Sequence, residues 1–155
     1  MSITALDLQE ADRFLPLDAR AWFRALPRDL QWHGLRVMRD LQRSGIDRSD
    51  VLAAALLHDA GKAVGPSGPI ERAMVVLAQK IAPKKFARYR SIDWRSARGL
   101  DRLFAVAWQH PHIAAKRAQL CGCDAITIEI IERHQDRSSN SDPLLIAFQK
   151  SDDRN

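Results

Sequence analysis

The stretch Val51-Leu-Ala-Ala-Ala-Leu-Leu-His-Asp-Ala-Gly-Lys62 decides how this chain folds. Its first seven residues are apolar and show no alternation, which is typical of a helix buried on all sides. The pattern predicts a helix over residues 48–60 that ends at Gly61, with His58 and Asp59 in its last turn. Two side chains that bind protons or cations are therefore expected at the end of a core helix.

Most of the remaining chain has the same helical character. Apolar residues recur at spacings of three and four, and Gly, Pro and Ser fall between these periodic blocks. We therefore expect an all-α fold, a single-domain helical bundle over residues 1–155 with its core in 28–153. The other expected helices cover 18–26 behind Asp18, 28–44 ended by Gly45, 69–82, 99–109, 111–121, 124–135 and 141–153 behind Ser141.

The composition restricts where the protein works. The N-terminus carries acids where a signal peptide carries basic residues, and no apolar run reaches membrane-spanning length. A soluble, cytoplasmic protein is expected. Cys121 and Cys123 are too few for a disulfide framework, and a bridge across one residue would be strained. We expect them to be packed small side chains rather than metal ligands.

Positive charge is concentrated in one segment. Residues 62–102 contain ten Lys/Arg and three acids, a local charge of +7 in a chain whose net charge is +5. This segment would attract anionic ligands, although a solvated surface or a nucleic-acid patch fits the charge equally. Within it, residues 83–99 interleave basic and aromatic residues without a clear period. They form either a lid facing the substrate or a frayed helix that packs Phe86 and Trp94 into the core.

Five segments each place an imidazole or a carboxylate on the apolar side of an expected helix. If such groups were buried without a partner, they would destabilise the folded chain by several kcal/mol. A divalent cation satisfies them together, because neutral imidazole nitrogen and ionised carboxylate oxygen are its natural donors. His112 is expected to point to the surface. The candidate metal ligands are His33, His58, Asp59, His110, His134 and Asp152.

The order of these residues resembles that of the HD superfamily of metal-dependent phosphohydrolases. The resemblance covers roughly residues 28–153, so it implies a helical bundle of the HD-domain type. Its strongest part is Leu56-Leu-His-Asp-Ala-Gly-Lys62. His33, His110-Pro111, Ile130-Ile-Glu-Arg-His134 and Asp152 match the remaining positions of members with two metals.

Two departures from the family pattern matter. The last motif usually reads Ala-Asp, whereas this chain has Ser151-Asp152-Asp153, which leaves both aspartates open as the last ligand. The apolar stripe before them favours Asp152. No Gly-Tyr-Pro follows His134, which disfavours the branch of cyclic-dinucleotide phosphodiesterases.

The resemblance implies hydrolysis of a phosphoester or phosphoanhydride in a nucleotide-like substrate by an activated water. One or two ions are expected, with manganese, iron, cobalt or nickel favoured over magnesium because imidazole ligands predominate. Asp59 and Lys62 are the expected catalytic residues. Lys62 is expected to bind a non-bridging phosphate oxygen, and Arg36 is either a second phosphate-binding residue or part of a solvated helix face.

The expected partner is thus a small anionic phosphorylated substrate, with no membrane involved and nucleic acid disfavoured as a ligand. Monomer and homodimer both stay open, as does the identity of the substrate. Two other functions remain as alternatives. One is a catalytically silent HD-type module that senses a ligand or binds a protein, and the other is a basic nucleic-acid binder acting through residues 62–102.

Overall fold

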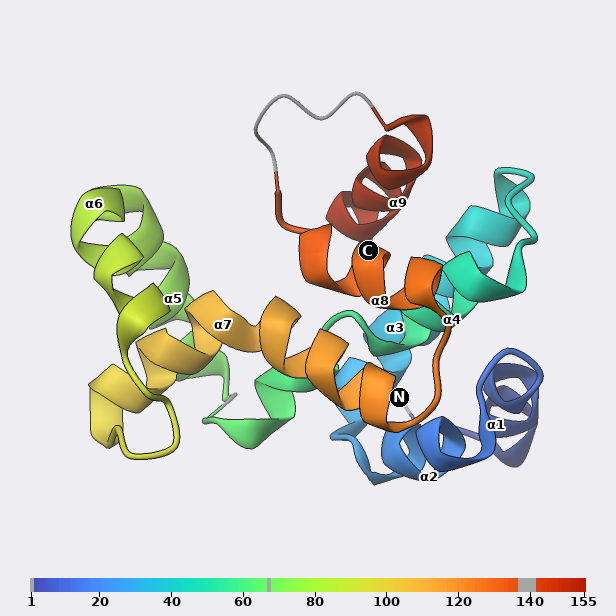
Figure 1. Ribbon diagram of the computed structural model, residues 1–155, viewed down its shortest axis with the longest axis horizontal. Helices are drawn as coiled ribbons and strands as arrows, with labels where there is room; N and C mark the ends of the chain where they lie inside the picture. The colour runs from blue at the N-terminus through green and yellow to red at the C-terminus, as the bar shows by residue number, and fades with distance from the viewer. Residues whose placement is uncertain (1, 67, 137–141) are drawn as a thin grey trace. The chain divides into compact units, whose positions relative to one another are not determined.

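The computed structural model describes residues 2–66, 68–136 and 142–155. These residues form helices and turns and contain no strand, so the expected all-α fold is confirmed (Figure 1). By its contacts the chain divides into two compact units. Unit 1 comprises Met1–Ala60 and Pro111–Asn155, and unit 2 comprises Gly61–His110. Each unit has a hydrophobic core of its own.

Unit 1 is built around one central helix. Helix α4 (Ser49–Leu57) is the apolar run of the sequence, and every residue from Val51 to Leu57 is buried. It contacts α3 and α8, and α3 in turn contacts α9. The end of α4 therefore lies deep among helices that come from distant parts of the chain. The helices of unit 1 are α1 (Ala5–Asp12), α2 (Leu17–Ala25), α3 (Arg28–Arg43), α4, the last part of α7 (Gly99–Leu120), α8 (Ala125–Arg133) and α9 (Pro143–Arg154).

The close packing of α3 on α4 depends on a glycine. A Cβ atom at Gly34 would lie 2.9 Å from the backbone oxygen of Leu56, a distance that backbone atoms cannot easily relieve. The absence of a side chain thus lets the two helices approach closely. As a result His33, the neighbour of Gly34, lies beside the end of α4.

The end of α4 differs from the prediction. The helix stops at Leu57 with His58 as its C-cap, and a 3₁₀ helix, η1 (Ala60–Val64), follows. Gly61 therefore does not terminate the helix, and its backbone lacks the positive φ found at Gly45. Instead, a Cβ at Gly61 would lie 2.1 Å from the backbone oxygen of His110. Glycine is required there for close approach of two backbone segments.

The prediction of two helices, 99–109 and 111–121, was wrong. A single helix, α7, continues through Pro111. Proline has no N–H, so the carbonyl of Ala107 loses its usual donor four residues later. The Nδ1 atom of His110 lies 2.9 Å from that carbonyl oxygen and takes the donor's place. The proline therefore sets the orientation of the histidine before it.

Helix starts were less predictable. Helix α2 begins behind Pro16, and Asp18 lies in its first turn rather than at the cap. Helix α9 begins at Pro143 behind Asp142, whose side chain accepts from the N–H of Leu144 and Leu145. Ser141, the expected cap, is outside the described residues.

Helix α1 was not anticipated at all, and it is held by polar contacts rather than by a strong apolar stripe. Thr4 and Asp7 form a reciprocal capping box. Arg39 on α3 donates to the Asp7 carboxylate at 2.5 Å. The hydrogen bond from Arg39, followed by those from Thr4, lowers the pKa of Asp7 to about 2.

These contacts make a prediction for acid stability. Since the pKa of Asp7 is lower in the folded chain, its contribution is present above about pH 4 and is lost as the pH falls toward 2. We expect Asp7→Asn to lower the free energy of unfolding by about 1 kcal/mol at neutral pH. The difference from wild type should shrink through that acid window in urea titrations. A difference that stays constant from pH 7 to pH 2 would contradict this role.

Unit 2 contains η1, α5 (Pro69–Ile81), α6 (Pro83–Phe86), η2 (Ala87–Ser91) and the first part of α7. Phe86, Tyr89 and Ala105 form its small core. Gln109 donates to the backbone oxygens of Tyr89 and Ile92, both at 2.7 Å. Residues 83–99 are thus packed helical turns, which favours the second sequence alternative. Phe86 is buried as that alternative predicts, whereas Trp94 is only partly buried and Tyr89 is buried instead.

Two further expectations concern the whole chain. In the described ranges, no helix combines the length and the apolar character that crossing a membrane requires. Cys121 and Cys123 are both unpaired and buried. Burial raises the pKa of the Cys123 thiol to about 11, so this side chain stays protonated and packs as a small apolar group.

Candidate metal centre

Three histidines are oriented by the same kind of hydrogen bond to the backbone. The Nδ1 atom of His58 lies 3.0 Å from the backbone oxygen of Ala55, and that of His134 lies 2.7 Å from the oxygen of Ile131. His110 makes the same contact with Ala107 in unit 2. In each case the partner is three residues earlier, at a helix end or before a proline, where carbonyls lack their usual donors. A carbonyl only accepts, so each Nδ1 carries the proton and each Nε2 presents a lone pair.

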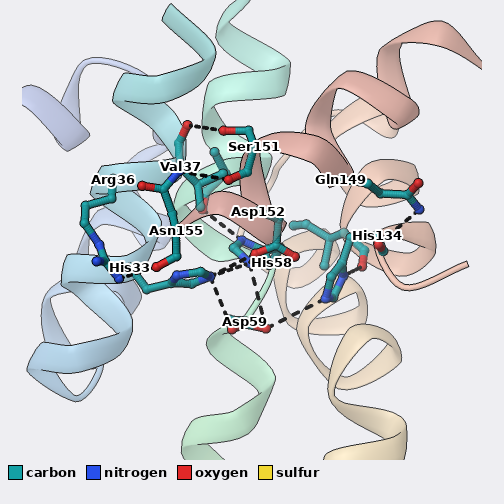
Figure 2. A network of polar contacts seen from close by, with 12 residues as sticks. His33, Arg36, Val37, His58, Asp59, His134, Gln149, Ser151, Asp152 and Asn155 are labelled. Carbon is teal, nitrogen blue, oxygen red and sulfur yellow. Dashed lines mark hydrogen bonds and ion pairs between the residues drawn. The ribbon is translucent and has the colours of Figure 1, made fainter. Parts of the chain in front are cut away.

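In unit 1 these lone pairs face a cluster of polar atoms (Figure 2). The Nε2 atoms of His33 and His58 are 3.1 Å apart. The Oδ1 atom of Asp152 lies 3.0 Å from the first and 3.2 Å from the second. Helix α3, helix α9 and the C-cap of α4 thus each place one side chain at the same point.

Asp59 connects this point with His134. Its Oδ2 atom is 3.6 Å from Nε2 of His33, and its Oδ1 atom is 3.7 Å from Nε2 of His134. Oδ1 also lies 3.8 Å from Nε2 of His58. Each carboxylate oxygen therefore faces a different histidine, and the turn after α4 is what allows adjacent His58 and Asp59 to reach one centre.

The residues fit a divalent cation. Acceptor atoms gather at short range, because the protons on His58 and His134 are committed to carbonyls. Only a proton or a cation among them relieves the repulsion between lone pairs. The atoms of His33, His58 and Asp59, and those of His58, His134 and Asp152, lie within 4.8 Å of one another in each group. Imidazole and carboxylate donors at this spacing suit a transition metal.

The electrostatics of Asp152 agree with a site for cations. Burial alone would raise the pKa of Asp152, but the contacts with His33 and His58 outweigh burial and hold the pKa below its ordinary value. The carboxylate is therefore ionised and available as a ligand. Asp153, the alternative last ligand, is exposed on α9. The structure places Asp152 against the histidines.

Two residues of α9 that the sequence analysis missed support the cluster. The Nε2 atom of Gln149 donates to the backbone oxygens of His134 and Asp136, at 3.1 and 2.7 Å. The hydroxyl of Ser151 lies 2.8 Å from a carboxylate oxygen of Asp40 on α3. Gln149 is a polar residue on the same face as Asp152, three residues earlier, and this position was the available signal.

Gln149 leads to a prediction about metal affinity. We expect Gln149→Leu to weaken manganese binding about 10- to 100-fold, because the turn that carries His134 loses two hydrogen bonds. Isothermal titration of the metal-free protein measures this affinity. Gln31→Leu is the matched control, since Gln31 is equally buried and donates to the backbone oxygens of Phe23 and Arg24. Equal metal affinity in both variants would contradict the positioning role of Gln149.

The other candidate residues lie elsewhere. Arg36 is exposed on α3 near His33 and donates to the backbone oxygen of Asn155 at 2.5 Å (Figure 2). His112 is exposed and pairs with Glu132, as expected for a surface residue. Lys62 and His110 belong to unit 2, where Lys62 lies in η1 and His110 in α7.

The fold and this cluster define a class of protein, an all-α protein with a buried centre of histidines and aspartates suited to divalent metal. A comparison with protein families agrees, since the HD domain matches residues 32–153. The chain therefore belongs to the HD domain family, which is part of a superfamily of metal-dependent phosphohydrolases that bind divalent metals. Neither the curated proteins nor the solved structures contain a significant match.

Proposed function

We propose that this protein hydrolyses a phosphoester or phosphoanhydride bond in a small, nucleotide-like substrate. The observation that carries the proposal is the convergence of His33, His58 and Asp152 within 3.2 Å, with the Asp59 carboxylate beside them. A pure binding module has no need for so many ionisable groups at one buried point. The family match supports the same class of reaction.

Each residue has a role that follows from its position. His33, His58, Asp59 and Asp152 would hold a first ion, and Asp59 with His134 would offer donors to a second. His110 is proposed as a further ligand from its Nδ1 contact and its place in the family pattern. When bound, the metal lowers the pKa of a water molecule and neutralises phosphoryl charge. The predominance of imidazole supports manganese, iron, cobalt or nickel over magnesium.

Two basic side chains are proposed to bind the substrate. Arg36 lies at the edge of the cluster, where its guanidinium would exchange the backbone oxygen of Asn155 for a phosphate oxygen. Lys62 is the neighbour of Gly61, whose backbone contacts that of His110 within unit 2. In the family pattern the same lysine follows the ligand pair, so we assign it to a non-bridging phosphate oxygen.

A combined metal and substrate assay tests the proposal. The purified protein is analysed for metal content, and then assayed with added manganese against nucleoside mono-, di- and triphosphates, dinucleoside polyphosphates, cyclic nucleotides and guanosine polyphosphates. We expect bound transition metal and metal-dependent turnover of at least one substrate class. Bound metal without turnover of any of them would favour the silent, ligand-sensing module instead.

A further inference from the structure

Helix α5 is only partly covered by the described residues of unit 2. None of its thirteen residues is buried. Ile70, Leu77 and Ile81 are 74%, 57% and 73% exposed. Their spacing of seven and four residues puts them in one stripe along the helix. Val75 and Ala78 on another face pack against the small core of unit 2, so the helix is anchored while its apolar stripe faces outward.

The segment around this stripe is strongly basic. Between Glu71 and Asp93 the sequence contains six Lys/Arg and no acid. Phe86 and Tyr89 are buried in the core of unit 2, and this packing leaves the neighbouring Lys84, Lys85 and Arg90 exposed. Figure 1 shows α6, which carries the two lysines, directly after α5. Exposed aliphatic side chains and unbalanced positive charge thus occur together on α5 and the turns that follow it.

We propose that α5 and the turns after it dock on an anionic lipid surface. A lipid bilayer offers negative headgroups to the lysines and an apolar layer to Ile70, Leu77 and Ile81. The expectation of no membrane partner rested on the lack of a spanning segment. That argument does not apply to a helix lying in the plane of the bilayer, and α5 is about 20 Å long, too short to cross it.

The other occupants of this surface fit less well. A second copy of the chain would bring two sets of like charges together around the paired stripes. A nucleic acid would match the charge but would leave the aliphatic stripe in water. The guanidinium groups of Arg95 and Arg102 lie 4.7 and 5.6 Å from the ring centre of Trp94, so this ring is less available to stack on a base.

Vesicle flotation of the whole protein tests the proposal. We expect flotation with vesicles of phosphatidylcholine and phosphatidylglycerol, and none with phosphatidylcholine alone. Each cation near an anionic surface strengthens binding about five-fold, so Lys84→Gln with Lys85→Gln should weaken it roughly 25-fold. Leu77→Ser with Ile81→Ser should weaken it at least ten-fold, because two aliphatic anchors are lost.

The chain offers a matched control for each variant. Leu17 and Leu120 in unit 1 are as exposed as the stripe, at 77% and 73%, so Leu17→Ser with Leu120→Ser should float like wild type. Lys116→Gln with Lys150→Gln, also in unit 1, controls for lost charge. Thermal unfolding of every variant verifies that the fold is kept, as expected for exposed positions.

Three results would overturn the proposal. The first is no flotation with anionic vesicles at low salt. The second is an equal loss of binding in the control variants. That result would show that the overall charge or the total exposed apolar area of the protein determines binding, rather than this surface. The third is tight binding of an oligonucleotide, lost in the lysine variant and kept in the leucine–isoleucine variant, without vesicle binding. That last outcome would assign the basic surface to nucleic acid.

Discussion

Asp59→Ala is expected to remove bound metal and hydrolytic activity together. Its two carboxylate oxygens face His33 and His134, so one substitution takes a donor away from both parts of the centre. We expect a fall in kcat/KM of at least about 1000-fold, because activation of water and neutralisation of phosphate charge both depend on the ion. Elemental analysis of the purified variant measures the loss of metal directly.

A second measurement does not depend on knowing the substrate. A ligand that binds only the folded chain stabilises it, by about 2.7 kcal/mol when its concentration is 100 times its Kd. Manganese should therefore raise the Tm of wild type and leave that of Asp59→Ala unchanged. Asp153→Ala is the matched control, because Asp153 is the exposed neighbour of Asp152 on α9. Full turnover or an undiminished Tm shift in Asp59→Ala would end the proposal of a metal-dependent hydrolase.

Much of the candidate site was predictable from residue spacing. An imidazole or carboxylate on an apolar helix face has an unfavourable energy unless it has a partner, and His33, Asp59, His134 and Asp152 all stood out in this way. The structure brings these four together with His58 in unit 1. Helical periodicity likewise identified most helices, since burial of an apolar stripe dominates their stability.

What sequence reasoning missed depends on backbone geometry and on single hydrogen bonds. Periodicity does not show that the carbonyl of Ala107 finds a donor in the ring of His110, so α7 was divided at Pro111. It also gave no sign of α1, which relies on the contacts of Thr4, Asp7 and Arg39. Gln149 escaped notice because a single glutamine among apolar residues more often lies on the surface than holds a buried turn by hydrogen bonds.

The remaining large effect concerns Gly61, whose role was misassigned from the sequence. We expect Gly61→Ala to lower the free energy of unfolding by about 2–4 kcal/mol, because a Cβ 2.1 Å from the backbone oxygen of His110 forces two backbone segments apart. If Gly61 only ended a helix, the same change would cost about 1 kcal/mol. Urea unfolding distinguishes the two magnitudes.

Asparagine makes the distinction sharper, because it tolerates positive φ but is larger than alanine. Gly45 is the matched control, since its φ is 88° and nothing would lie within 4 Å of an added Cβ. At Gly45, asparagine should therefore restore most of what alanine loses. At Gly61 it should restore nothing, because the obstacle is the carbonyl of His110 rather than a backbone angle. A Gly61→Asn variant as stable as wild type would show that the residue terminates a helix after all, and that the close approach to α7 is not required.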